Sequence, residues 1–366
     1  MKSLRFAPLA LLTFVALFIT GCQEDEVKSD KTIVPATFRV DIPSSISYTA
    51  TSGRQKSDTL NGNEIYRHLG TFINVGKTAS ELVEGIIHGI SVYNIDKAMT
   101  MSFNGEDDNR VKNLVVTESS TFDGTTWDYQ LTVTDALSEG ADDGGKAIQI
   151  FWNDEAPIRG VAIVKPYNCD RPTNLHIPDA MFRVDYSEDG TLGYDAHMIV
   201  TVAGLTLADE VTEPFSMNNL KMFAGRKGDI VDVYGNSNHP NAKLFSDEKG
   251  FNWSFVASSD RVKNIGVAEV GLPFISVNST DRAVLLEDYS IYNVFHDGIM
   301  DAWPGIDQEK LQAFLTTAAA PGYFDDGGFI AGGTSPGADW NTISGRIDDL
   351  IPYNPSSVNS LTLSFK

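Results

Sequence analysis

The chain has 366 residues, with 49 Asp and Glu against 28 Lys and Arg, and its formal net charge at pH 7 is −21. This acidic balance argues against nucleic acid as a partner, since phosphates must be neutralised by Lys and Arg, and against docking on anionic lipid headgroups. It is compatible with Ca²⁺, which binds carboxylate oxygens. The length and the 42% hydrophobic content suffice for two domains with their own cores.

Residues 1–21 have the layout of a secretory signal peptide. Two positive charges, Lys2 and Arg5, precede an apolar run that ends at Ile19, and small residues then lead to Cys22. The run is shorter than the about 20 apolar residues that a membrane-spanning helix needs. The segment contains two basic and no acidic residues, so its removal leaves a net charge of −23.

The string Ile19-Thr20-Gly21-Cys22 resembles the lipobox of bacterial lipoproteins. The resemblance implies that residues 1–21 are removed and that Cys22 becomes a lipidated N-terminus, with acyl chains such as palmitate. Each buried CH₂ contributes about 0.8 kcal/mol, so several chains anchor a protein stably. The polar residues 22–36 then form a tether. An ordinary signal peptide followed by a chance cysteine is the alternative.

The residues after the cysteine refine the expected location. Gln23-Glu24-Asp25-Glu26 resembles the acidic export tag of Bacteroidota-type lipoproteins, which implies an outer-membrane protein displayed on the cell surface. Attachment facing the periplasm is the alternative. Asp58-Thr59-Leu60 resembles the O-glycosylation site of the same bacterial group, which makes Thr59 a candidate glycosylation site.

Four short strings occur twice in the same order, which suggests an internal duplication. The pairs are Phe38–Asp41 with Phe182–Asp185, Arg110–Asn113 with Arg261–Asn264, Asp142–Gly145 with Asp325–Gly328, and Pro166–Asn168 with Pro352–Asn354. The distance between the copies grows along the chain, which indicates an insertion in the second. We therefore expect repeat units at 37–172 and 177–366, with a helical insertion at about 271–323. Chance recurrence of short strings is the alternative.

Both expected units have the pattern of β-strands. Residues Trp127 to Thr134 alternate apolar and polar side chains, as a half-buried strand does. Polar turns between apolar runs predict hairpins. The expected hairpins pair 98–103 with 111–117, 220–224 with 229–234, and 251–257 with 262–270, and more deeply buried strands are expected at 160–164 and 198–202.

Helices are fewer. The segment 80–93 places Leu82, Ile86 and Ile87 on one face, with Ser80 as the expected N-cap, and a second helix is expected at 307–319. No regular alternation of strands and helices occurs. The predicted fold class is mainly β, with two duplicated antiparallel β-rich domains, sandwich or barrel, and a few peripheral helices.

The duplicated Asp-Asp-Gly-Gly loops provide candidate calcium ligands, namely Asp142, Asp143, Asp325 and Asp326. An ordinary turn is the alternative, because Asp and Gly suit turn dihedrals. No other cofactor is predicted.

Five tryptophans are candidates for stacking on a ligand: Trp127, Trp152, Trp253, Trp303 and Trp340. Trp127 and Trp253 lie inside expected strands and favour a core role. Trp152 and Trp340 occupy corresponding places in polar loops of the two units, so they are predicted to form an exposed ligand platform.

Catalytic patterns are weak. Gly333 to Gly337 fits the G-x-S-x-G elbow, but no histidine follows Ser335 as the triad order requires. Cys169 has no histidine close in sequence and is expected to be passive. The 49 acidic residues identify no particular pair for glycoside hydrolysis.

The function predicted from these observations is a non-catalytic surface lipoprotein. It would bind an outer-membrane protein or a glycan, as a binding module or as a subunit of an outer-membrane assembly. Two alternatives stay open: an extracellular hydrolase that acts on glycans through paired carboxylates, and a Ca²⁺-dependent adhesive or structural component.

Overall fold

The computed structural model describes residues 35, 37–47, 62–91, 95, 97–105, 108–205, 216–245 and 249–366. The signal peptide, Cys22, the acidic tag and Thr59 lie outside the described residues. Contacts between Cα atoms divide the chain into two compact units. Unit 1 contains the described residues up to Arg39, Thr78–Ala208 and Thr362–Lys366, and unit 2 contains Val40–Lys77 and Asp209–Leu361.

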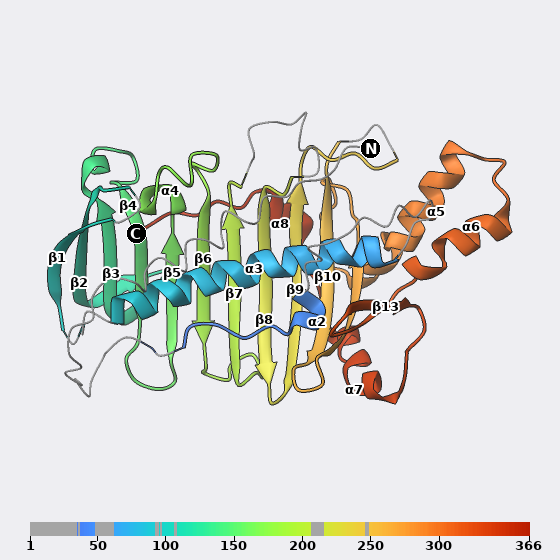
Figure 1. Ribbon diagram of the computed structural model, residues 1–366, viewed down its shortest axis with the longest axis horizontal. Coiled ribbons are helices and arrows are strands. Elements are labelled where there is room, and N and C mark those ends of the chain that lie inside the picture. Colours follow the sequence, from blue (N-terminus) through green and yellow to red (C-terminus); the bar gives the residue numbers. More distant parts are fainter. Residues whose placement is uncertain are drawn as a thin grey trace. The chain divides into compact units, whose positions relative to one another are not determined.

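Unit 1 contains seven strands, each of which pairs antiparallel with the next one along the chain (Figure 1). Two short helices, η1 (Ala136–Ser138) and α4 (Pro166–Cys169), follow β3 and β5. The strands are β1 (Met99–Asn104), β2 (Val111–Phe122), β3 (Thr125–Asp135), β4 (Lys146–Trp152), β5 (Arg159–Val164), β6 (Met181–Ser187) and β7 (Ala196–Ala203).

The strands expected in this unit are confirmed. The alternating segment at 127–134 lies within β3, where Trp127, Leu131 and Val133 are buried, and β1 and β2 form the expected hairpin. Trp127 packs with Phe151, Val161 and Ile163, and Phe365 lies against the same cluster. Apolar side chains on alternate positions thus form the core under the strands.

Unit 2 contains six strands that also pair antiparallel in chain order. Both expected hairpins, β8–β9 and β10–β11, are confirmed. The strands are β8 (Asn219–Lys227), β9 (Ile230–His239), β10 (Phe251–Asp260), β11 (Ile265–Gly271), β12 (Gly322–Asp325) and β13 (Gly328–Gly332).

The helices of unit 2 are mostly short. Between β11 and β12 lie η2 (Ala283–Asp288), α5 (Ile291–Ala302), α6 (Gln308–Leu315) and η3 (Thr316–Ala318). The others are α2 (Ser44–Ser47), η4 (Ala338–Trp340), α7 (Asn341–Ser344), η5 (Ile347–Asp349) and α8 (Pro355–Asn359). Of the described helices, none has both the length and the apolar character needed to cross a membrane.

The 30-residue helix α3 (Gly62–Ser91) contributes its first part to unit 2 and its second part, from Thr78, to unit 1. In unit 2 it crosses successive strands (Figure 1). The ring of Tyr66 lies 5.6 Å from that of Phe324 in β12, and the ring of Phe72 lies 4.9 Å from that of His239 in β9.

The predicted start of this helix is wrong. Ser80 lies inside α3 and is fully buried, so it is not the N-cap. The first half of the helix contains Gly70 and Gly76, which disfavour helix by about 1 kcal/mol each. The buried residues Leu69, Phe72 and Ile73 show that tertiary packing outweighs this propensity.

The mainly β, antiparallel architecture is confirmed, whereas the duplication and the closure into sandwiches or barrels are not. Within each unit the described strands form an open series of neighbours. Contacts place β6 and β7 in unit 1, and the division into compact units falls near Ala208, whereas the repeat units at 37–172 and 177–366 stay a prediction. The repeated strings also differ in local structure, since Phe182–Asp185 lies in β6 and Phe38–Asp41 forms no strand.

Gly160 in β5 lies where a side chain has no room. A Cβ atom there would be 2.4 Å from Cε2 of Phe38 and 2.7 Å from the carbonyl oxygen of Phe151. We expect Gly160→Ala to lower the free energy of unfolding by about 1–3 kcal/mol through overpacking, seen as a lower urea midpoint. Gly140→Ala is the control, because a Cβ at Gly140 meets no atom within 4 Å. Equal effects of the two substitutions would contradict this account.

Candidate functional site

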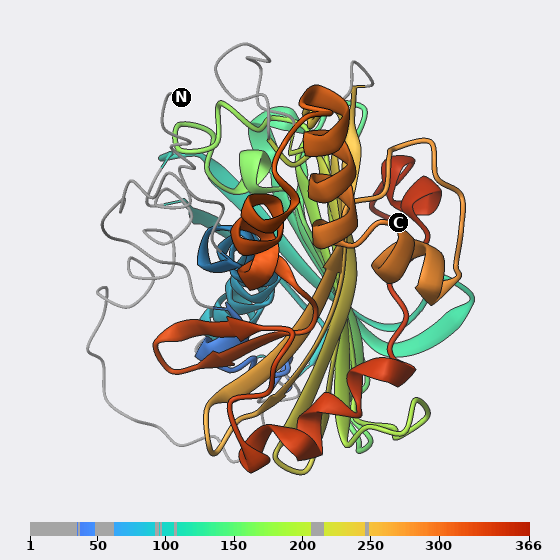
Figure 2. The same ribbon diagram turned by 90° about the vertical axis from the view of Figure 1, so that its right-hand side faces the viewer.

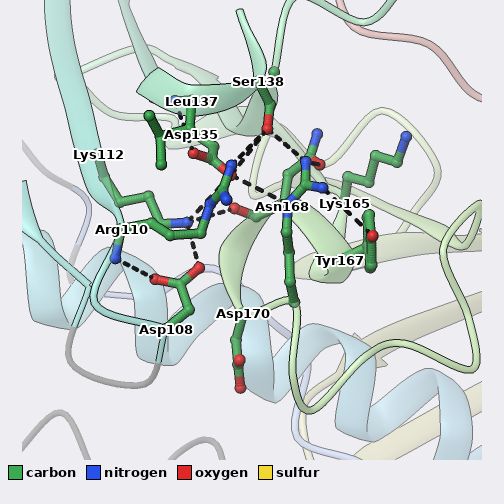
Figure 3. A network of polar contacts seen from close by, with 12 residues as sticks. Asp108, Arg110, Lys112, Asp135, Leu137, Ser138, Lys165, Tyr167, Asn168 and Asp170 are labelled. Atoms are coloured by element: carbon green, nitrogen blue, oxygen red, sulfur yellow. Dashed lines mark hydrogen bonds and ion pairs between the residues drawn. The ribbon is translucent and has the colours of Figure 1, made fainter. Parts of the chain in front are cut away.

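A network of charged side chains lies in unit 1 (Figure 3). It starts from the register of the β2–β3 ladder, in which Lys112 faces Asp135 directly. The Nζ atom of Lys112 lies 3.8 Å from Oδ2 of Asp135. At the end of β3, Oδ1 of Asp135 accepts a hydrogen bond from the backbone N–H of Leu137 at 3.1 Å and so caps η1.

Two guanidinium groups converge on the same buried carboxylate. Arg110 Nε donates to Oδ2 of Asp135 at 2.7 Å, and Arg171 Nε donates to the same atom at 3.3 Å. The Oγ atom of Ser138 accepts from both guanidinium groups, at 2.9 and 2.5 Å. The side chain of Asp135 is fully buried, whereas those of Arg110 and Arg171 keep 23% and 27% of their surface exposed. Three cations therefore surround one carboxylate.

The remaining carboxylates of the network are also paired. Lys112 Nζ donates to Asp108 at 2.8 Å and to the carbonyl oxygen of Asn168 at 2.9 Å. Asp143 accepts from Lys165 Nζ at 2.7 Å and from Asn168 Nδ2 at 3.0 Å. The network thus joins β2, β3, α4 and the loop before β4. Each of the carboxylates Asp108, Asp135 and Asp143 is paired with a lysine or arginine, which favours a structural role. We call this network the clamp.

The same contacts set the protonation of the clamp. Burial raises the pKa of Asp135, but the hydrogen bond from Arg110 and the charge of Lys112 outweigh burial and leave the pKa below its ordinary value. At Asp143 burial likewise acts upward, and Lys165 and the backbone N–H of Gly145 bring the pKa below its ordinary value. Both groups are ionised at neutral pH.

These shifts predict acid sensitivity. A carboxyl whose pKa is lower in the folded state adds stability above its unfolded pKa of about 3.9, and this contribution is lost as the pH falls through the folded pKa. We expect the urea midpoint of unit 1 to be steady near neutrality and to decline below about pH 4. In Asp143→Asn the decline should be shallower, while Asp142→Asn, at an exposed neighbour, should keep the wild-type slope. Identical slopes in both variants would disprove the link.

The predicted calcium ligands do not form a ligand set. Asp143 is held by Lys165, and Asp142 is exposed beside it. Asp325 accepts from the backbone N–H of Gly327 at 2.8 Å in the β12–β13 turn, next to the exposed Asp326. Among the described residues, no three His, Cys, Asp or Glu side chains are grouped as a metal site requires.

The predicted exposed platform at Trp152 and Trp340 is wrong in its burial. Trp152 ends β4, is 1% exposed and stacks on Tyr129 with ring centroids 5.5 Å apart. Trp340 is half-buried, packs against the core of unit 2 and donates from Nε1 to the carbonyl oxygen of Phe324 at 3.1 Å. Polar neighbours in sequence suggested loops, but both rings serve the core.

Burial raises the pKa of two groups whose chemistry bears on catalysis, Cys169 and Glu269. Burial raises the pKa of the Cys169 thiol to about 12, so the thiol is protonated at neutral pH. Burial also raises the pKa of Glu269 in β11, even though the guanidinium of Arg282 donates to its carboxylate. Glu269 is therefore a half-buried carboxyl group that is paired with Arg282 and has a pKa above its ordinary value.

Unit 2 contains a helical hairpin formed by α5 and α6, drawn in orange in Figure 2. It carries the most exposed large aromatic side chain among the described residues. Helices α5 and α6 pack through Ile299, Leu311 and Leu315, and Tyr292 donates to Gln312 at 2.7 Å between them. Trp303 lies in the turn between the helices and is 63% exposed.

The turn that carries Trp303 is held by its backbone. The N–H of Trp303 donates to the carbonyl oxygen of Ile299 at 2.8 Å, and the carbonyl oxygen of Trp303 accepts from Ile306 at 3.0 Å. Asp307 caps α6 by accepting from the N–H of Lys310. We call residues Met300 to Ile306 the Trp303 tip. It presents a large apolar ring on a fixed support.

Sequence reasoning missed both features. The clamp joins Arg110, Asp135 and Arg171, which are far apart in the chain and meet only once the strand register is known. Trp303 had a readable signal, because Pro304 and Gly305 mark a turn between two helical patterns. Comparison of the chain with models of protein families, with characterised proteins and with solved structures finds no match.

Proposed function

We propose that the protein is an outer-membrane lipoprotein, anchored through lipidated Cys22 and displayed on the cell surface, that acts as a non-catalytic subunit of an outer-membrane assembly. The observation that carries the proposal is Trp303, 63% exposed at the turn of a helical hairpin. Tryptophan is enriched among the residues that supply most of the binding energy at protein interfaces.

The support beneath the ring favours this role. A hairpin with its own apolar contacts at Ile299, Leu311 and Leu315 fixes the position of the turn, and two backbone hydrogen bonds hold the backbone of Trp303 in that turn. A preorganised anchor loses less conformational entropy on binding than a mobile one. Single exposed aliphatic residues such as Val262, by contrast, are ordinary on protein surfaces.

A photo-crosslinking amino acid tests this function in cells that make the full, lipidated chain. Benzoylphenylalanine replaces the exposed Ala302, beside Trp303, or in a control Val262, which is 72% exposed in the same unit. We expect one discrete cross-linked product with an outer-membrane protein from position 302, lost in Trp303→Ala, and none from position 262. The same products from both positions, or no product at 302, would overturn the proposal.

Glycan hydrolysis is the second candidate, and Glu269 is the observation that favours it. A carboxyl group with a raised pKa can donate a proton to a leaving sugar. If this candidate holds, the purified protein releases reducing sugar from a polysaccharide panel and Glu269→Gln does not. Equal release of reducing sugar by the wild type and Glu269→Gln, or no release by the wild type, would exclude this candidate function.

A further inference from the structure

We infer that the Trp303 tip docks into an apolar cleft with a positively charged rim on a partner protein. The inference rests on the proposed function and specifies the chemistry of the partner.

Acidic side chains surround the tip. The hairpin from Ile291 to Leu315 contains four acidic residues and one lysine. All four acidic residues are exposed, and they are Asp297, Asp301, Asp307 and Glu309. Asp301 precedes Trp303 by two residues, and Asp307 follows it by four, so the chain carries exposed negative charge on both arms of the turn.

This arrangement has the anatomy of an interface anchor. A central aromatic side chain that becomes desolvated supplies affinity, and charges at the rim set the partner and the association rate. The rim of the Trp303 tip is negative, and the complementary rim is therefore built from Lys and Arg. Met300 and Ile306, at the two ends of the tip, are half-buried and pack against the core of the hairpin, so Trp303 is the exposed apolar centre.

The same charges disfavour two other binding partners for the exposed tip, namely a membrane surface and a second copy of this chain. A membrane surface is anionic and attracts basic residues, so four carboxylates oppose insertion of the ring. A second copy of this hairpin would bring like charges together, and its whole chain carries a net charge of −21. A cationic protein surface is the occupant that both the ring and its rim fit.

The test is a charge reversal in the cross-linking assay with the probe at position 302. Asp301→Lys with Glu309→Lys reverses the rim and leaves the helix cap Asp307 intact. The matched control, Asp326→Lys with Asp349→Lys, makes the same change at two exposed carboxylates of the same unit. We expect the rim reversal to reduce the yield of the cross-linked product about tenfold or more and the control to keep it. Raising the salt should reduce the wild-type yield.

The outcomes separate this inference from the proposed function. If a discrete product forms but the rim reversal and salt leave it unchanged, the function stands and the cationic partner is refuted. Sequencing of the cross-linked partner peptide should find Lys or Arg beside the cleft, and an acidic surface there would also refute it. A product between two copies of this chain, or flotation of the unlipidated protein with phosphatidylglycerol vesicles that Trp303→Ala abolishes, would overturn it in favour of self-association or membrane docking. Far-UV circular dichroism of each variant checks that the fold is kept.

Discussion

Asp135→Asn should lower the free energy of unfolding of unit 1 by about 1–3 kcal/mol, because hydrogen bonds to a charged group are lost while the arginines that made them keep some contact with water. The carboxylate of Asp135 is fully buried and accepts hydrogen bonds from Arg110 and Arg171. The amide of asparagine is neutral, so the positive charges of the two guanidinium groups no longer have a negative partner at this position. Lys112 keeps Asp108 as its partner, so the loss falls on the two arginines.

Hydrogen exchange of the amides in β2 and β3, followed by mass spectrometry, measures this effect in unit 1. Asp142→Asn is the control, because Asp142 is exposed and lies seven residues along the same connection to β4. We expect faster exchange in Asp135→Asn and wild-type exchange in Asp142→Asn. If Asp135→Asn changes the exchange by no more than its control, the clamp does not hold these strands together.

Cys22→Ala should release the protein from membranes that are washed with high salt. The resemblance of residues 19–22 to a lipobox implies that the acylated cysteine anchors the protein in lipid, and the acidic body of the protein is not attracted to anionic lipid. The salt wash weakens any contact with a partner protein through the charged rim of the Trp303 tip. Removal of the thiol removes the site of lipidation.

Fractionation of cells and the mass of the N-terminal peptide measure this loss. Cys169→Ala is the matched control, because it also removes one thiol and leaves the lipobox intact. We expect Cys169→Ala to stay in the outer-membrane fraction with an acylated N-terminus. Retention of Cys22→Ala in the salt-washed fraction, or an unmodified wild-type N-terminus, would refute lipid anchoring.

The local part of the fold could be read from the sequence. Alternation along 127–134 and the polar turns between apolar runs predicted strands and hairpins that the structure contains, because hairpin pairing depends on residues close in the chain. The open series of strands could not be read in this way. Sheet closure and unit boundaries depend on contacts between distant segments, and short repeated strings gave no information about those contacts.

The candidate sites were harder to predict for the same reason. Trp152 is buried because it stacks on Tyr129 in the neighbouring strand. Asp143 is an ion-pair partner because Lys165, just after β5, lies within hydrogen-bond distance of its carboxylate. Neither partner is evident from a linear pattern. The helical hairpin at Trp303 was easier to predict from the sequence, since a helix expected at 307–319 follows the turn residues Pro304 and Gly305.

The place of α5 and α6 in the chain has a consequence for how this protein can change over time. Strands β11 and β12 pair directly, with Gly266 opposite Phe324, although about fifty residues separate the two strands in sequence. Substitutions around Trp303 therefore leave every backbone pairing of the strands untouched. The surface proposed to bind a partner can therefore change in sequence while the strands keep their pairing. We expect relatives with the same strands to differ mainly in the segment between β11 and β12.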